Sequence, residues 1–335
     1  MEFKKVTADN LKVALEESAI LLKRAEVVLE KDYWLCFVLD YIFNKSLWKN
    51  AFTFKGGISL SKCFNLIERF SEDIDLILDW KVLGYQKEDF LLERSNVQQD
   101  KFNKSTVPRI EEWLENVFIP QLQDDLNKLT NQKLEISLDQ SMKQSVLIKY
   151  PNFFNSLYIK NYIRLKIGIL SEDEPFVIAK IKPDIYDKFP MLFEGDGFEV
   201  RTIKPERTFW EKATILHHEA NRPQNSKFPI RYARHYYDLY RIANSEYKSS
   251  LFDHLSLLRR IALFKNKLYP QRWAQYEEIA QQTLKLIPKS YRWNEISRDY
   301  YEMIEMLYGE IPDFNEMLKA LIELEKEIRE YKKQD

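Results

Sequence analysis

The sequence has few of the residues that disulfide-linked or zinc-stabilised proteins need. Its 335 residues include two cysteines, Cys36 and Cys63, and four histidines. Two thiols are too few for a disulfide framework or a cysteine-based zinc cluster. The histidines lack HExxH or other zinc spacing, and the absence of GxxxxGK excludes a phosphate site of that type. We therefore expect a chain that works in the reducing cytoplasm.

Long apolar runs and excess charge are also missing. The N-terminus lacks the apolar segment of a signal peptide, and no apolar run approaches the ~18 residues of a membrane span. The net charge is −1, so overall charge gives no argument for nucleic acid, and a basic groove would have to be local. With 45% hydrophobic and 31% charged residues, we expect a folded globular protein.

Residue patterns predict an α+β protein with two lobes. We expect an α/β lobe with N-terminal helices over residues 1–200 and a helical lobe over 201–335, with the boundary region at 182–200. Predicted helices cover residues 8–25, 27–43, 107–130 (beginning at Pro108), 204–220, 229–244, 247–264, 272–286, 296–308 and 313–333. Predicted strands are 52–55 and 73–78, a pair at 133–138 and 143–150, and another pair at 162–170 and 175–181. Residues 81–105 are expected to be rich in loops.

Glycine is scarce, yet two of the seven glycines are adjacent, Gly56 and Gly57, between a predicted strand and a predicted helix. A helix that begins there has free backbone N–H groups, which together with the helix dipole favour anions such as phosphate. Glycine also allows close approach to the backbone. Ser59 and Lys62 add a hydroxyl and a cation to the same segment. An ordinary tight turn is the alternative interpretation of the glycine pair.

Two aspartates follow on the next predicted strand, in the segment SEDID. Alternate residues of a strand point to one face, so Asp73 and Asp75 would place carboxylates ~7 Å apart on one surface. Mg²⁺ commonly binds one or two carboxylates together with substrate phosphates. Taken alone, such a pair is more often a solvated strand edge. Combined with the glycine turn and Ser71, it predicts a metal site next to a phosphate site.

Five segments resemble the AbiEii/AbiGii family of nucleotidyltransferase toxins, MenT-like relatives of the DNA polymerase β superfamily. They are EKDYWLCFVLDYIF (30–43), FKGGISLSK (54–62), RFSEDIDLIL (69–78), ERTFWEKATILHH (206–218) and RYARHYYDLYRI (231–242). The resemblance implies a nucleotidyltransferase fold, with a small mixed sheet and flanking helices followed by a helical lobe, and an active site between the lobes. It also implies a toxin of a toxin–antitoxin or phage-defence module, with a cognate antitoxin or regulator encoded nearby.

The resemblance further implies residue roles. Ser71, Asp73 and Asp75 match the SxDxD positions, Lys212 matches a helical lysine, and Asp238 matches a late aspartate. Asp73 and Asp75 would hold Mg²⁺ or Mn²⁺, and the phosphates of a nucleoside triphosphate (NTP) would be bound by Gly56, Gly57, Ser59, Lys62, Ser71 and Lys212. Asp238 would bind metal or orient Lys212. Family members usually have a third carboxylate on an adjacent strand, but Lys166 stands at that position, and neither Asp184 nor Glu194 obviously replaces it.

The expected reaction transfers a nucleoside monophosphate from an NTP to RNA, with the 3′ end of tRNA as the first candidate. Residues 201–241 hold nine Lys or Arg against four acids, which would suit an RNA backbone. Their tyrosines (Tyr232, Tyr236, Tyr237 and Tyr240) could stack on bases, although helical spacing favours a core role. Two alternatives are a transferase that modifies a protein hydroxyl and a non-catalytic NTP- or RNA-binding module.

Overall fold

The computed structural model describes residues 1–156 and 159–332. The chain divides into two compact units: residues 1–63 with 71–203, and residues 64–70 with the chain from Lys204 onward. The sequence-based division places a single boundary after residue 200 and gives no sign that residues 64–70 belong with the helical unit. Within the described residues, no helix is both long enough and apolar enough to cross a membrane.

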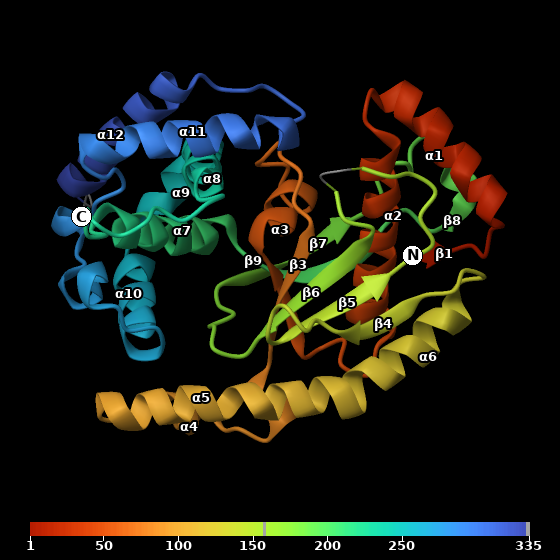
Figure 1. The fold of residues 1–335 in the computed structure, drawn as a ribbon, viewed down its shortest axis with the longest axis horizontal. Helices are drawn as coiled ribbons and strands as arrows, with labels where there is room; N and C mark the ends of the chain where they lie inside the picture. Colours follow the sequence, from red (N-terminus) through yellow and green to blue (C-terminus); the bar gives the residue numbers. More distant parts are fainter. Residues whose placement is uncertain (157–158, 333–335) are drawn as a thin grey trace. The chain divides into compact units, whose positions relative to one another are not determined.

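A mixed seven-stranded sheet forms the centre of the first unit (Figure 1), and the α+β prediction is confirmed. Its strand order is β4-β5-β6-β3-β2-β9-β7. The strands are β2 (Phe52–Lys55), β3 (Asp73–Leu78), β4 (Glu135–Leu138), β5 (Ser145–Lys149), β6 (Tyr162–Gly168), β7 (Phe176–Ile181) and β9 (Phe198–Ile203). β3 runs antiparallel to β2 and parallel to β6. Two short strands, β1 (Glu2–Phe3) and β8 (Phe193–Glu194), pair separately.

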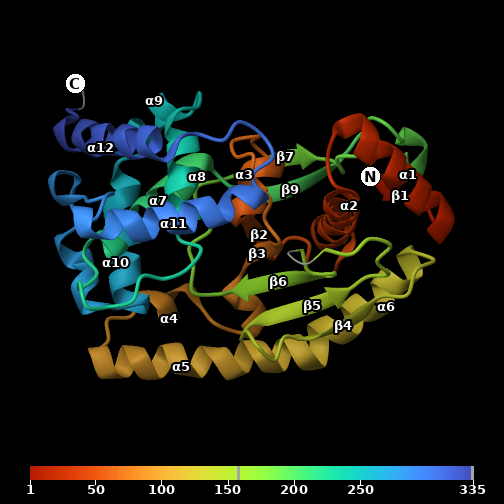
Figure 2. The ribbon, with the colours of Figure 1, turned by 45° about the horizontal axis from the view of Figure 1, so that its top comes forward.

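The first unit also contains helices. They are α1 (Ala8–Leu22), α2 (Glu26–Asp40), α3 (Gly56–Lys62), α4 (Lys87–Leu91), α5 (Asn96–Trp113) and α6 (Ile119–Leu129). α2 packs against β6 and β9, whereas α6 packs beside β4 at one sheet edge (Figures 1 and 2). Every residue from Leu29 to Phe43 is buried, because this segment passes through the core between α1 and the sheet.

Several predicted elements of the first unit are wrong in place or partner. α5 begins at Asn96, so residues 96–105 are helical, and Pro108 lies inside the helix. Ser95 and Gln98 form a capping box, a sequence pattern that marks the start of a helix. The predicted start at Pro108 overlooks this pattern. β6 and β7 do not pair, because β9 lies next to β7. β9 begins inside the predicted boundary region 182–200. Its strand could not be recognised from sequence, because strand formation depends on tertiary packing.

The second unit is helical. Its helices are α7 (Pro205–Ala220), α8 (Ala233–Ala243), α9 (Lys248–Asp253), α10 (Ser256–Leu268), α11 (Trp293–Met303) and α12 (Phe314–Glu330). The predicted helix 272–286 is wrong: short 3₁₀ turns occupy this segment, and Gln275 has a left-handed φ of 51° that interrupts helical geometry. The last residue of the predicted helix 313–333 lies outside the described residues.

Residues 64–70 join this helical unit through backbone hydrogen bonds. Arg69 forms an antiparallel bridge with Leu307. The Phe70 N–H donates to the Met306 carbonyl at 2.7 Å, and the Tyr308 N–H donates to the Glu68 carbonyl at 3.0 Å. The segment is therefore attached to the second unit by backbone hydrogen bonds, although it lies between α3 and β3 in sequence.

Candidate active site

Gly56 makes room for Asp75. β2 ends at Lys55, which lies opposite Asp75 in the antiparallel pair with β3. Gly56 follows with a φ of +87°, a conformation that residues with a Cβ rarely adopt. A Cβ built on Gly56 would lie 2.2 Å from Asp75 Oδ2. The glycine therefore lets the backbone at the start of α3 lie directly against the carboxylate.

Asp73 and Asp75 share the outward face of β3, because the alternate residues Ile74 and Leu76 are buried. On the neighbouring β6, Arg164 lies beside Asp73 and Lys166 beside Asp75. Lys166 Nζ is 2.6 Å from Asp73 Oδ2, and Arg164 Nη1 is 3.7 Å from Oδ1. Lys166, which stands where a third carboxylate is expected, is therefore paired with the first aspartate.

The donor set fits a divalent cation in part. Two carboxylates on one face can supply two oxygen ligands, with phosphate and water oxygens as the remainder. Among residues 1–156 and 159–332, no group of three or more His, Cys, Asp or Glu side chains is arranged to hold a metal. Asp184, one candidate third acid, instead binds Arg24 and Lys62. A cation at Asp73 would also have to compete with Lys166.

Two of the predicted phosphate ligands make internal contacts. Lys62 Nζ lies 2.7 Å from both Asp32 Oδ1 and Asp184 Oδ1. Burial by itself lowers the pKa of Lys62, but these carboxylates outweigh it and raise the pKa well above its usual value. Ser59 is fully buried and donates its hydroxyl to the Gly56 carbonyl at 3.0 Å. Both contacts hold α3 in place, which leaves the glycine backbone as the stronger phosphate candidate.

Ser71 is the first residue after segment 64–70 that belongs to the sheet unit again, and it is half-buried. The next residue, Glu72, holds this part of the backbone in place. Its Oε2 accepts hydrogen bonds at 3.1 Å from Lys31 Nζ and from the Lys160 N–H. The loop that carries Ser71 into β3 is thus anchored to α2 and to the segment before β6.

In the second unit, a buried carboxylate holds two cations. Asp238 on α8 is fully buried; Arg69 donates to it from Nε at 2.6 Å and from Nη2 at 2.8 Å, and Lys212 Nζ on α7 lies 2.7 Å from Oδ2. Burial alone raises the pKa of Asp238, but these two charges hold it well below its usual value. Burial lowers the pKa of Lys212, and Arg69 acts in the same direction, while Asp238 opposes both.

The surroundings of this carboxylate carry excess positive charge. Arg234 lies close enough to Lys212 to lower its pKa, in the same direction as Arg69. The neighbouring His235 stays neutral, because burial and Lys212 hold its pKa well below the usual value. Arg234 Nε and His235 Nδ1 are buried without a hydrogen-bond partner among the described residues. This arrangement suits an incoming anion such as phosphate.

The basic segment 201–241 has fewer side chains available to bind RNA than its composition indicates. Ion pairs engage five of its nine cations, namely Arg201, Arg207, Lys212, Arg222 and Arg241. Tyr236 and Tyr237 are buried in the core, so they cannot stack on bases. Arg231 and Lys227 are exposed. Arg69 is the site residue whose role the sequence conceals, because its partner Asp238 lies 169 positions away.

Comparisons with known proteins give one family match and several structural similarities. Residues 38–320 match the protein family described as nucleotidyl transferase AbiEii toxin, type IV TA system. No curated protein matches the chain significantly. JHP933 from Helicobacter pylori is similar at a TM-score of 0.46 and 14% identity, over 91% of this chain and 93% of that one. MenT4, the nucleotidyltransferase toxin Rv2826c from Mycobacterium tuberculosis H37Rv, is similar at 0.45 and 12%, over 94% and 96%.

Proposed function

The chain belongs to the AbiEii family of nucleotidyltransferase toxins of type IV toxin–antitoxin systems, and we propose that its acceptor is RNA, with the 3′ end of tRNA as the first candidate. Family membership implies an NTP substrate and an antitoxin partner. The observation that carries the residue assignment is the pair Asp73 and Asp75 on one face of β3, with Asp75 against the Gly56 backbone.

In this proposal Asp73 and Asp75 hold Mg²⁺ or Mn²⁺, and the bound ion would neutralise phosphate charge. The backbone N–H groups of Gly56 and Gly57, together with Ser71, bind phosphate oxygens. Lys212 supplies a further positive charge for the phosphates, and Asp238 positions Lys212 through the 2.7 Å ion pair. Asp238 is too fully engaged by Arg69 and Lys212 to serve as a metal ligand in this arrangement.

The reaction is a displacement at the α-phosphorus. A hydroxyl oxygen of the acceptor forms a bond to the α-phosphorus and gives up its proton to water, while the bond from that phosphorus to the bridging oxygen breaks and pyrophosphate leaves. The chain's residues contribute positioning and charge compensation rather than a covalent intermediate. Binding energy from the phosphates would hold the NTP while the acceptor hydroxyl approaches.

The test is to incubate the full chain with each of the four α-labelled NTPs, Mg²⁺ and total cellular RNA. We expect one or more labels at RNA 3′ ends, and Asp73→Asn and Asp75→Asn should abolish labelling while the thermal unfolding temperature changes little. Label recovered in protein would instead identify a protein acceptor. Absence of label from both RNA and protein, with a folded chain, would contradict transferase activity under these conditions.

A second candidate function is non-catalytic sequestration of NTP or RNA. It is favoured by Lys166, which stands at the position of the third carboxylate and pairs with Asp73. Expression of the chain in a bacterial host separates the two functions. If transfer causes growth arrest, Asp73→Asn should relieve it and RNA 3′ ends should revert to their encoded sequence. Arrest that persists in Asp73→Asn, with unmodified RNA ends, would favour sequestration.

A further inference from the structure

Lys31 connects three segments of the sheet unit from a buried position. It lies in the first half of α2 and is 1% exposed. Its Nζ donates to Glu72 Oε2 at 3.1 Å and to the Lys160 carbonyl at 3.0 Å. The Lys160 N–H donates to the same Glu72 oxygen at 3.1 Å. One buried ammonium therefore ties together α2, the residue before β3 and the segment before β6, all within the sheet unit.

Glu72 lies between two residues of the candidate active site. Ser71, which precedes it, is assigned above to phosphate, and Asp73, which follows it, is assigned to metal. β3 and β6 run parallel from this point, with Asp73 beside Arg164. Because consecutive Cα atoms are only about 3.8 Å apart, a contact that fixes Glu72 also restricts where its two neighbours can lie. Lys31 can therefore act on the site without contacting the substrate.

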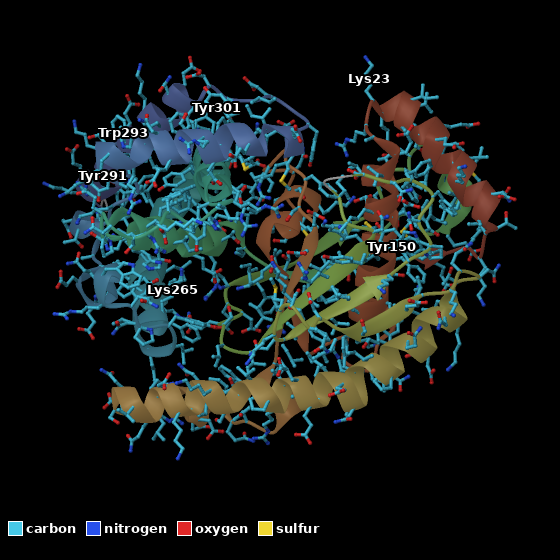
Figure 3. All side chains as sticks on the ribbon, in the orientation of Figure 1. Lys23, Tyr150, Lys265, Tyr291, Trp293 and Tyr301 are labelled. Carbon is cyan, nitrogen blue, oxygen red and sulfur yellow. The ribbon has the colours of Figure 1, made fainter. Side chains whose placement is uncertain are left out.

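The helix that carries Lys31 is itself firmly held. Trp34 on α2 stacks on Tyr150 at the end of β5, with ring centroids 5.8 Å apart and an interplanar angle of 18°, and both side chains are buried. Figure 3 labels Tyr150 beside this helix. One position after Lys31, Asp32 Oδ1 lies 2.7 Å from Lys62 Nζ at the end of α3. The same part of α2 therefore supports both β3, which carries the aspartates, and α3, which begins at the glycine pair.

A direct effect of its charge is the alternative role for Lys31. Burial lowers the pKa of Lys31, while Glu72 and Asp73 oppose this shift, so the ammonium lies within electrostatic reach of Asp73. A cation in such reach repels a metal ion and would weaken metal binding. A contact that holds Asp73 in place would instead strengthen metal binding. The two roles therefore predict opposite changes in metal affinity when the ammonium is removed.

We propose that Lys31 is a positioning residue for the transfer reaction, and that through Glu72 it holds Ser71 and Asp73 where phosphate and metal bind. The inference rests on the proposed function and adds a residue that contacts neither substrate nor metal. Hydrogen bonds between charged groups are strong and geometrically specific, and in this buried setting water does not compete for them. The ammonium therefore fixes the Glu72 carboxylate, and the backbone on either side of Glu72 is fixed with it.

The first experiment measures metal binding without turnover. Mn²⁺ is titrated into the full chain and free Mn²⁺ is followed by electron paramagnetic resonance. Lys31→Met should weaken Mn²⁺ binding by about tenfold, because Asp73 is no longer held in place, and this loss should disappear when Asp73→Asn is added. Glu72→Gln keeps an oxygen that accepts from both donors, so its Mn²⁺ affinity should stay within about twofold of the parent. Equal or tighter Mn²⁺ binding in Lys31→Met would overturn the proposal.

The second experiment measures transfer. Lys31→Met should lower kcat/KM about tenfold to a hundredfold, mainly through kcat, because other groups still hold the NTP. Adding Glu72→Ala should cause little further loss, since both residues act through one contact. The matched control is Lys45→Met, which removes the partner of the buried Asp40 at the other end of α2 and should lower stability without affecting transfer. An equal loss of transfer in Lys45→Met would assign the effect to destabilisation and overturn the proposal.

A third experiment needs neither metal nor substrate. Amide hydrogen exchange of peptides that cover residues 71–78 should be faster in Lys31→Met than in the parent chain and in Lys45→Met. Equal exchange of these peptides in all three chains would overturn the positioning role. The two proposals fail separately: faster exchange and weaker Mn²⁺ binding in a chain without transfer would contradict only the proposed reaction. Transfer that Lys31→Met leaves unchanged would contradict only the positioning role.

Discussion

The Cα of Gly56 faces Asp75 so closely that a Cβ there would lie 2.2 Å from the carboxylate oxygen Oδ2. Gly56→Ala should therefore displace Asp75 and also strain the backbone, whose φ is +87°. A shift of about 1 Å in a reacting group can lower the rate about 100-fold, so we expect a loss of that order in kcat/KM for transfer.

The control for this variant is Gly168→Ala. Gly168 ends β6, and a Cβ there would meet no atom within 4 Å. We expect near-normal transfer for Gly168→Ala. Equal activity of the two variants would show that the close approach between Gly56 and Asp75 has no catalytic importance.

Asp238 and Lys212 should respond differently to substitution. Asp238→Asn leaves Arg69 and Lys212 buried without their counter-charge, so we expect a loss of about 3–5 kcal/mol in the free energy of unfolding. Lys212→Met leaves the two hydrogen bonds between Arg69 and Asp238, and it should cost less stability while weakening NTP binding about tenfold to a hundredfold.

Urea unfolding and calorimetric NTP titration measure the two effects, with Asp253→Asn as an exposed control. A large loss of stability in Lys212→Met with unchanged NTP affinity would give this lysine a purely structural role.

Lys166 should compete with metal for Asp73. Because its ammonium lies 2.6 Å from Asp73 Oδ2, Lys166→Met removes a cation that a metal would have to displace. We expect Mn²⁺ to bind Lys166→Met more tightly than the unmodified chain, measured by electron paramagnetic resonance of free Mn²⁺. Lys143→Met serves as the control, and the gain should disappear when Asp73→Asn is added. Weaker Mn²⁺ binding in Lys166→Met would contradict the competition.

Glu30 gives the stability of the sheet unit a pH dependence. Burial raises the pKa of Glu30 from 4.5 to about 7, although Glu30 accepts a hydrogen bond from the Phe153 N–H at 2.7 Å. Between these values the unfolded chain releases the proton while the folded chain keeps it. The free energy of unfolding should therefore fall as pH rises from about 4.5 to about 7, by up to about 3 kcal/mol, and then level off.

Urea unfolding at several pH values tests this effect. Glu30→Gln should flatten the dependence in that pH range, whereas Glu17→Gln, a change at an exposed position, should leave it intact. A Glu30→Gln chain with the unmodified pH profile would assign the dependence to other groups.

The local part of the candidate site could be predicted from sequence. Short-range patterns place β2 at Phe52–Lys55 and β3 at Asp73–Leu78, as expected, and alternation puts both aspartates on one face. The strand partners could not be predicted, since β9 joins β2 from more than 140 positions away, with Thr202 opposite Phe54. Such pairing depends on tertiary packing.

The contacts of individual side chains could not be predicted from sequence either. Lys62 and Ser59 look like phosphate ligands in sequence, because nothing local reveals that Asp32 and Asp184 bind the lysine or that Ser59 faces the interior. A cation near a glycine turn has the same pattern whether it binds a ligand or a distant carboxylate. The roles assigned here to Asp73, Asp75, Lys212 and Asp238 stay predictions until the variants are measured.

Residues 64–70 belong to the helical unit although they lie within the sequence of the sheet unit. This limits how the protein can be recombined with its relatives. A chimera that exchanged only the chain after Ile203 would separate Arg69 from Asp238 and the backbone of Phe70 from that of Met306. The helical unit is inherited as a discontinuous module, with seven residues encoded well upstream of the rest. Substitutions in those seven residues and in α8 should therefore evolve together, and a working hybrid must exchange both segments at once.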